Sequence, residues 1–178
     1  MIKNRYKAAL AVLALSLATS TLKAVVSDDL GVEADHAILA MVNADSALTN
    51  LFDHSAGFAV FPGAGKGGVV FGGLYGKGLL YENGKPVGRA KVHQLNFGLQ
   101  MGGQSFYEVV FFENAATLQR FKKAPFETCA EMSAIAISKG ASLNPRYREG
   151  VVIYALPRAG FMAQAAIAAQ KFSYQPFN

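Results

Sequence analysis

The chain has 178 residues, of which 52% are hydrophobic and 16% are charged, and its formal net charge is +5. This length fits one domain, and so hydrophobic a composition excludes a disordered polyelectrolyte. The single cysteine excludes an intrachain disulfide framework and a cysteine-based zinc site, while 18 glycines, 13 phenylalanines and no tryptophan favour a turn-rich β protein.

The first 24 residues have the pattern of a secretory signal peptide. A basic start with Lys3, Arg5 and Lys7 precedes an apolar run over residues 8–18 and a segment of small and polar residues. The run is shorter than the about 20 apolar residues that cross a bilayer. We therefore predict a signal peptide at residues 1–24 and a single domain at residues 25–178, with a retained N-terminal anchor helix as the alternative.

Two cleavage positions fit the end of this leader, one after Ser20 and one after Ala24. The only cysteine, Cys129, lies far from the leader, and no twin-arginine pair is present, so we expect general export and no lipoprotein anchor. The predicted location is periplasmic or secreted.

The charge of the remaining chain is split into two blocks. Residues 25–54 carry six acidic residues and no lysine or arginine, a net charge of −6, whereas residues 55–178 carry 13 basic and six acidic residues, a net charge of +7. With the leader removed the chain is close to neutral, and it has no nucleic-acid motif, so no nucleic-acid partner is predicted. Two interpretations of the split remain open: the acidic N-terminal segment docks on the basic body, or the body offers a basic face to lipid head groups, which the acidic segment partly covers.

The acidic segment is predicted to be helical over residues 33–53. Apolar residues recur at helical spacing from Ile38 to Phe52. Residues 43–46 divide the segment into two helices, with Asp45 or Ser46 as the cap of the second.

From residue 57 the pattern changes to strands. The predicted strands are residues 57–61, stopped by Pro62, then 67–73, 74–81 and 85–93, a pair formed by 94–101 and 105–113, and finally 150–156. Asn83-Gly84 predicts a type I′ hairpin, because both central residues of that turn need a positive φ.

Helices are expected among these strands. Asn114 is predicted to cap a short helix over residues 115–123, with Leu118 and Phe121 on one side. Residues 126–137 fit either helix or strand, and the alanine content of residues 161–169 favours a helix.

One glycine-rich stretch satisfies a nucleotide-binding pattern in part. Residues 63–68 read GAGKGG and match G-x-G-x-x-G, but a strand pattern follows where a dinucleotide-binding fold needs a helix. We interpret these glycines as permitting turns and bends in a curved sheet.

No set of residues composes an active site. The histidines His36, His54 and His93 form no metal-ligand pair. Glu108 and Glu113 fall on opposite faces of one strand, and we interpret them as its polar ends. Cys129 is interpreted as a small core residue. We therefore predict no enzymatic activity, no catalytic residues, no metal and no cofactor.

Cations beside aromatic residues mark the candidate binding site. These residues are Lys66, Lys77, Lys85, Arg89, Lys91, Phe71 and Tyr75. Such a combination suits an anionic interface, where each cation contributes about 1 kcal/mol near a charged membrane surface. The alternative is that they are ordinary solvated loop residues.

Several motifs occur together in an order that resembles SYLF domains, also called the lipid-binding or actin-regulator-related family. They are residues 57–62 (GFAVFP), 65–68 (GKGG), 75–78 (YGKG) and 98–105 (GLQMGGQS). The tail, with residues 140–142 (GAS), 147–150 (YREG) and 170–177 (QKFSYQPF), is similar to the exported bacterial branch of that family.

This resemblance implies an α+β fold, in which an antiparallel, barrel-like β-sheet has N-terminal helices and one short internal helix packed on it. It also implies strands at residues 126–137 and 161–172, against the helix that alanine content favours in the second. Eukaryotic relatives bind phosphoinositides through a basic N-terminal region, and some bind actin. Here that region is acidic, and we expect no actin binding by an exported bacterial protein. The family carries no catalytic residues to transfer.

The sequence thus favours a non-enzymatic cell-envelope protein that binds anionic phospholipid, or a membrane surface, through basic glycine-rich loops. The alternative is a structural or protein-interaction module of the periplasm that binds no lipid.

Overall fold

The computed structural model describes residues 29–66, 73–95, 104–123, 125–128, 135–136, 146–159 and 170–177. Its strands form a single sheet in the order β5-β8-β3-β2-β1-β4-β7-β6. The strands are β1 (Gly57–Lys66), β2 (Gly73–Glu82), β3 (Lys85–Leu95), β4 (Gln104–Phe112), β5 (Phe126–Glu127), β6 (Ile135–Ala136), β7 (Val151–Ala159) and β8 (Gln170–Pro176). Neighbouring strands in this order pair antiparallel, except that β6 pairs parallel with β7.

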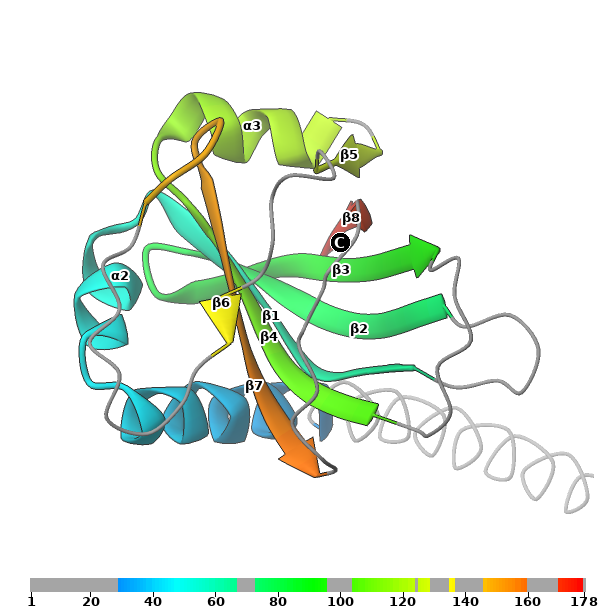
Figure 1. The fold of residues 1–178 in the computed structure, drawn as a ribbon. Coiled ribbons are helices and arrows are strands. Elements are labelled where there is room, and N and C mark those ends of the chain that lie inside the picture. The colour runs from blue at the N-terminus through cyan, green and yellow to red at the C-terminus, as the bar shows by residue number, and fades with distance from the viewer. Residues whose placement is uncertain are drawn as a thin grey trace, which may run out of the picture.

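The sheet curls into a half-barrel (Figure 1). The rings of Phe112 on β4 and Phe126 on β5 lie 6.4 Å apart, although four other strands separate β4 from β5 in the sheet. A flat sheet cannot bring these strands into contact, since neighbouring strands are about 4.7–4.9 Å apart. The predicted α+β fold with a barrel-like sheet and helices packed on it is confirmed.

The two faces of the sheet bury separate apolar clusters. The inner core gathers under α3 (Ala115–Lys123) and includes Phe112, Phe121 and Phe172. The outer core lies under the helical residues 29–44 and α2 (Leu48–His54), and includes Met41 and Tyr154. Successive strand residues face opposite sides, so one sheet supplies both cores, and each has its own helical cover (Figure 1).

The helices begin and end near their predicted positions. The N-terminal helix ends at residue 44 and α2 begins at Leu48, so the predicted break is confirmed. Asp45 Oδ1 accepts a hydrogen bond of 3.0 Å from the Ala47 N–H within this break. The N-cap residue of α2 is Ala47, however, and no side chain caps the helix, so the predicted cap at Asp45 or Ser46 is wrong. Asn114 Oδ1 accepts from the Thr117 N–H at 3.0 Å, which confirms it as the cap of α3.

The predicted β2–β3 hairpin is also confirmed. Asn83 and Gly84 have φ values of 50° and 71°, and Glu82 pairs with Lys85 on either side of them. These are the left-handed conformations that a type I′ turn requires.

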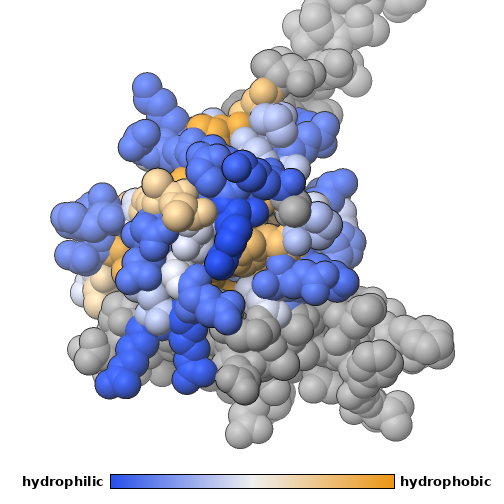
Figure 2. All heavy atoms as spheres, turned by 90° about the horizontal axis from the view of Figure 1, so that it is seen from above, coloured by the Kyte–Doolittle hydropathy of each residue, from blue (hydrophilic) through white to orange (hydrophobic). Residues whose placement is uncertain are grey.

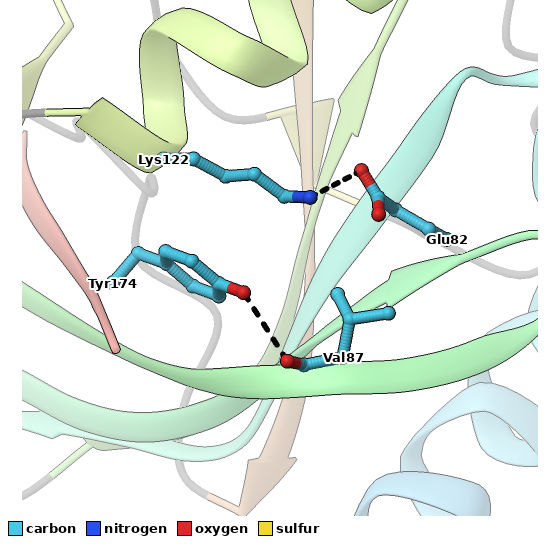
Figure 3. Close-up of polar contacts among 4 residues, drawn as sticks. All are labelled: Glu82, Val87, Lys122 and Tyr174. Atoms are coloured by element: carbon cyan, nitrogen blue, oxygen red, sulfur yellow. Dashed lines mark hydrogen bonds and ion pairs between the residues drawn. The ribbon is translucent and has the colours of Figure 1, made fainter. Parts of the chain in front are cut away.

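Two side-chain contacts hold α3 and β8 against this hairpin (Figure 3). Lys122 Nζ lies 2.5 Å from Glu82 Oε1, and the Tyr174 hydroxyl donates a hydrogen bond of 3.2 Å to the Val87 carbonyl oxygen. The ammonium of Lys122 also lies 5.8 Å from the centre of the Tyr174 ring, so the two contacts are linked.

Pro62 does not stop β1, as the sequence predicted. The strand continues to Lys66, and its register against β4 shifts between Phe61 and Ala64. An irregularity of this kind frees one strand position from the ladder, so a residue without an N–H is tolerated there. The Pro62 carbonyl oxygen accepts a hydrogen bond of 3.1 Å from Arg158 on β7.

The predicted pairing of residues 94–101 with 105–113 is wrong in the described part. Gln94 continues β3 and pairs with Leu74 and Gln170. Between residues 105 and 112, β4 has β1 on one side and β7 on the other, so neither of its edges is free for a hairpin partner.

Parts of the remaining predictions fall outside the described residues. These are the segments 67–72, 96–103 and 161–169. For residues 161–169, the described structure therefore does not decide between the predicted strand and the predicted helix. The SYLF resemblance implied strands at residues 126–137 and 161–172. Within these ranges the structure has strands at residues 126–127, 135–136 and 170–172, the last as the start of β8, whereas Thr128 is not in a strand. Among the described residues, no helix is both long enough and apolar enough to cross a bilayer.

Candidate functional site

Two lysines face each other on the outer face of the sheet. Lys77 on β2 is directly opposite Lys91 on β3, and the neighbouring pair in the same register is Tyr75 with His93. All four side chains are exposed. Directly opposite residues of an antiparallel pair share a face, so these side chains form one surface.

The same surface continues onto β8. Lys171 lies opposite His93, Ser173 opposite Lys91, and Gln175 opposite Arg89. We call this surface the cationic strip. Its members are Tyr75, Lys77, Arg89, Lys91, His93 and Lys171.

The two central lysines are not neutralised by the described part of the chain. Like charges directly opposite each other on neighbouring strands are destabilising. Neither Lys77 nor Lys91 takes part in an ion pair with another described residue. An anionic ligand bound between them would remove this repulsion, whereas Lys171 already pairs with the Glu127 carboxylate at 2.7 Å.

Aromatic side chains flank the cations of the strip. The Tyr75 side chain is 44% exposed, and its ring meets the His93 ring edge-on at 4.9 Å. Phe177 is 45% exposed, and the Arg89 guanidinium lies 6.0 Å from its ring centre. Exposed aromatic rings beside cations, here an amphipathic tyrosine and an apolar phenylalanine, are typical of a surface that meets the boundary between head groups and acyl chains.

The acidic helical segment packs on the same face of the sheet as the strip. Ala34, Ala37 and Met41 are fully buried in the outer core, against residues that include Leu79 of β2. In the part of the chain that the structure describes, no ion pair joins an acidic residue of 29–54 to the cationic strip. The helix is thus docked on the body through apolar contacts, and the strip remains exposed.

The predicted site residues are brought together only in part. Tyr75, Lys77, Arg89 and Lys91 share the strip, in strands rather than in the glycine-rich loops that the sequence suggested. Lys85 lies at the β2–β3 turn, at the opposite end of the hairpin from Tyr75.

Two predicted residues are placed incompletely. Lys66 ends β1 opposite Leu74 and Gln104, and its side chain lies outside the described part. Phe71 lies outside the described residues altogether.

Sequence reasoning missed three residues at this surface, namely His93, Lys171 and Phe177. A signal for the first was present, because Arg89, Lys91 and His93 alternate with the apolar residues of β3 and therefore share a face. No local signal places Lys171 or Phe177 beside them, because β8 joins β3 only through the fold of the whole sheet.

A second basic surface lies on α3, at the opposite side of the half-barrel. Arg120 and Lys123 are exposed there, and Arg120 donates a hydrogen bond of 3.2 Å to the Glu149 carbonyl oxygen. Figure 2 shows this face, on which hydrophilic side chains surround smaller apolar areas. Among the described residues, the large exposed apolar side chains are Val32, Leu39, Tyr75 and Phe177, none of which belongs to α3. The cationic strip is therefore the better candidate for an amphipathic interface.

Glu108 departs from the sequence interpretation. It is not a polar strand end but a fully buried residue in the middle of β4, whereas Glu113 follows β4 and is exposed. Burial raises the pKa of the Glu108 carboxyl from 4.5 to about 7, and the hydrogen bond from Gln170 partly opposes this rise. At neutral pH this group therefore holds a proton for much of the time.

A buried carboxyl alone does not make a catalytic site. Its hydrogen-bond partner is the Gln170 amide at 3.0 Å. An amide side chain donates hydrogen bonds but does not ionise, so it cannot act as a general acid or base. Within the described ranges, no three His, Cys, Asp or Glu side chains are grouped so as to hold a metal ion. His36 and His54 are exposed in the helical region.

The comparisons with known proteins give one distant relative. No family model matches the chain. Over 141 residues the chain is 27% identical to Beta cell expansion factor A from Aeromonas veronii, an alignment that covers 78% of this chain and 53% of the relative. The chain thus spans about half the length of the curated relative that it matches.

Proposed function

We propose that this chain is a non-enzymatic protein of the cell envelope, periplasmic or secreted, that binds anionic phospholipid through the cationic strip. The observation that carries the proposal is the pair of Lys77 and Lys91, whose exposed side chains are directly opposite each other and form no ion pair with another described residue. Arg89 and the exposed rings of Tyr75 and Phe177 extend the same surface.

Two sequence features also support this proposal, namely the resemblance to SYLF domains and the signal-peptide pattern of the first 24 residues. The name of the relative, Beta cell expansion factor A, mentions no reaction. The chain would act by attaching to a surface rather than by turning over a substrate. Its acidic helical segment is a structural part of the domain, since that segment supplies residues of the outer core.

We expect the double variant Lys77→Ala/Lys91→Ala to bind anionic vesicles about 30-fold more weakly than the wild type, since each cation contributes about 1 kcal/mol at a charged surface. The measurement is co-sedimentation of residues 25–178 with phosphatidylglycerol/phosphatidylcholine vesicles at low and physiological salt. Binding should weaken as salt rises, because the interaction is electrostatic.

The matched control is Arg120→Ala/Lys123→Ala, which removes the same charge from the exposed surface of α3. This control should bind within a few-fold of the wild type. Equal and negligible binding of the wild type to anionic and pure phosphatidylcholine vesicles would refute the proposal. An equal loss in both double variants would show that net charge, and not the strip, determines binding.

The second candidate function is a protein-interaction module that binds no lipid. It is favoured by Val32 and Leu39, which are seven residues apart on the N-terminal helix and both exposed. Residues at this spacing lie on one side of a helix. Absence of vesicle binding together with a loss of partner binding in Leu39→Asp would support it.

A further inference from the structure

One hydrogen bond crosses the interior of the half-barrel. The Gln170 side-chain amide on β8 donates to Glu108 Oε2 on β4 at 3.0 Å. Three strands, β3, β2 and β1, lie between β8 and β4 in the sheet. This contact therefore joins the two sides of the curl directly and does not belong to the sheet ladder.

The same glutamine also fixes the end of β5. Its backbone N–H donates to Thr128 Oγ1 at 3.0 Å, and its carbonyl oxygen accepts from the Thr128 N–H at 2.9 Å. Gln170 thus connects the β5–β8 side of the sheet to β4. The neighbouring rings of Phe126 and Phe172, 6.4 Å apart, belong to the inner core that this connection closes.

The surroundings of Glu108 do not compensate a negative charge. Its strand neighbours are Phe61 on β1 and Ala155 on β7, both buried and apolar. Glu108 is 0% exposed, and its Oε1 has no hydrogen-bond partner among the described residues.

Cationic groups on the packed elements face elsewhere. His93 on β3 and Lys171 on β8 lie on the outer face, in the cationic strip. Arg158 on β7 is exposed and lies 4.9 Å from the ring centre of Tyr107, on the outer side of β4. Lys66 ends β1, but its side chain lies outside the described part. Among the described side chains, no lysine, arginine or histidine is therefore available to pair with an ionised Glu108 inside.

A buried carboxylate without a cation is strongly disfavoured relative to the neutral acid. The closed half-barrel therefore prefers protonated Glu108. In the closed state Glu108 keeps its proton up to a pH of about 7, whereas an exposed glutamate releases its proton near pH 4.5. Rising pH therefore destabilises the closed state. Protonation of Glu108 stabilises the closed state fully below pH 4.5. This stabilisation decreases as the pH rises to about 7, and above that pH the stability of the closed state changes little.

We propose that the contact between Glu108 and Gln170 is a pH-sensitive latch, which holds β5 and β8 against β4 while Glu108 is protonated and releases them when it ionises. Release exposes the inner-core rings of Phe126 and Phe172. The latch is independent of the cationic strip, because it lies on the other face of the sheet.

The test is hydrogen–deuterium exchange of residues 25–178 between pH 5.5 and 8.5, corrected for the intrinsic pH dependence of exchange. Peptides covering residues 170–177 should lose at least 10-fold in protection as the pH rises. The upper limit over this pH range is about 30-fold, because about 10-fold of the roughly 300-fold effect of raising the pKa from 4.5 to about 7 is already lost by pH 5.5. Peptides from β1 and β2 should change less. In Glu108→Gln, which keeps the shape but cannot ionise, protection of residues 170–177 should be independent of pH.

The matched control is Glu113→Gln, which removes an exposed carboxyl just beyond β4 and should behave as the wild type. Constant protection of residues 170–177 in the wild type overturns the latch, and this measurement decides the matter even if Glu108→Gln fails to fold. An equal pH effect in the wild type and in Glu108→Gln also overturns it, as does an equal loss of protection throughout the sheet.

Discussion

Replacing Phe121 by alanine is expected to lower the free energy of unfolding by about 3–5 kcal/mol. The Phe121 side chain is fully buried on α3, and its ring lies 4.7 Å from Phe112, 5.6 Å from Phe126 and 5.9 Å from Phe172. One residue thus connects the helix to β4, β5 and β8. Truncation leaves a cavity where these elements meet, and the curled sheet cannot collapse to fill it. Urea denaturation of residues 25–178, followed by circular dichroism, measures the loss.

The control for this substitution is Phe177→Ala. Phe177 has the same side chain but is 45% exposed, so its removal should change the free energy of unfolding by less than about 0.5 kcal/mol. Similar losses in the two variants would show that the aromatic cluster under α3 does not stabilise the domain as described.

The second large effect is expected at Gly78. A Cβ atom at this position would lie 2.2 Å from the backbone oxygen of Val60 and 2.6 Å from Cδ1 of Phe61. Since a backbone oxygen cannot move aside without displacing β1, Gly78→Ala should lower the free energy of unfolding by about 3 kcal/mol, at the upper end of the range for overpacking. The same denaturation experiment measures it.

Gly31→Ala provides the opposite control. Gly31 lies in the N-terminal helical segment, and a Cβ there would meet nothing within 4 Å. Alanine is favoured over glycine inside a helix, so this variant should be about 0.5–1 kcal/mol more stable than the wild type. If Gly78→Ala were as stable as the wild type, the close approach of β1 to β2 would be contradicted.

The role of Gly78 shows which part of the fold the sequence could predict. The YGKG motif was part of the resemblance that implied a barrel-like sheet, and the structure places β1 so close to β2 at Gly78 that there is no room for a side chain. The Asn83-Gly84 turn and the Asn114 cap were predictable for a related reason, because their signals lie within four residues of each other. The irregularity at Pro62 was not predictable, since it depends on the register of β1 against β4.

The candidate site and its surroundings also have one part that the sequence could predict and one that it could not. Tyr75, Lys77, Arg89 and Lys91 were predicted because one local hairpin carries them all. The Glu108–Gln170 contact was missed because its two residues are 62 positions apart in the chain. A glutamate within an apolar strand can be predicted to be buried only when its hydrogen-bond partner across the barrel, here Gln170, is known.

The position of β8 beside β3 has a consequence for the order in which the domain folds. The β2–β3 hairpin closes over the two residues Asn83 and Gly84, whereas Gly88 on β3 pairs with Pro176, which is 88 residues further along the chain. Closing so long a loop is entropically costly, and sheets with such distant pairings fold slowly. We therefore expect the hairpin to form early and the half-barrel to close late. Until β8 arrives, β3 has an unpaired edge that a second chain can use as a template.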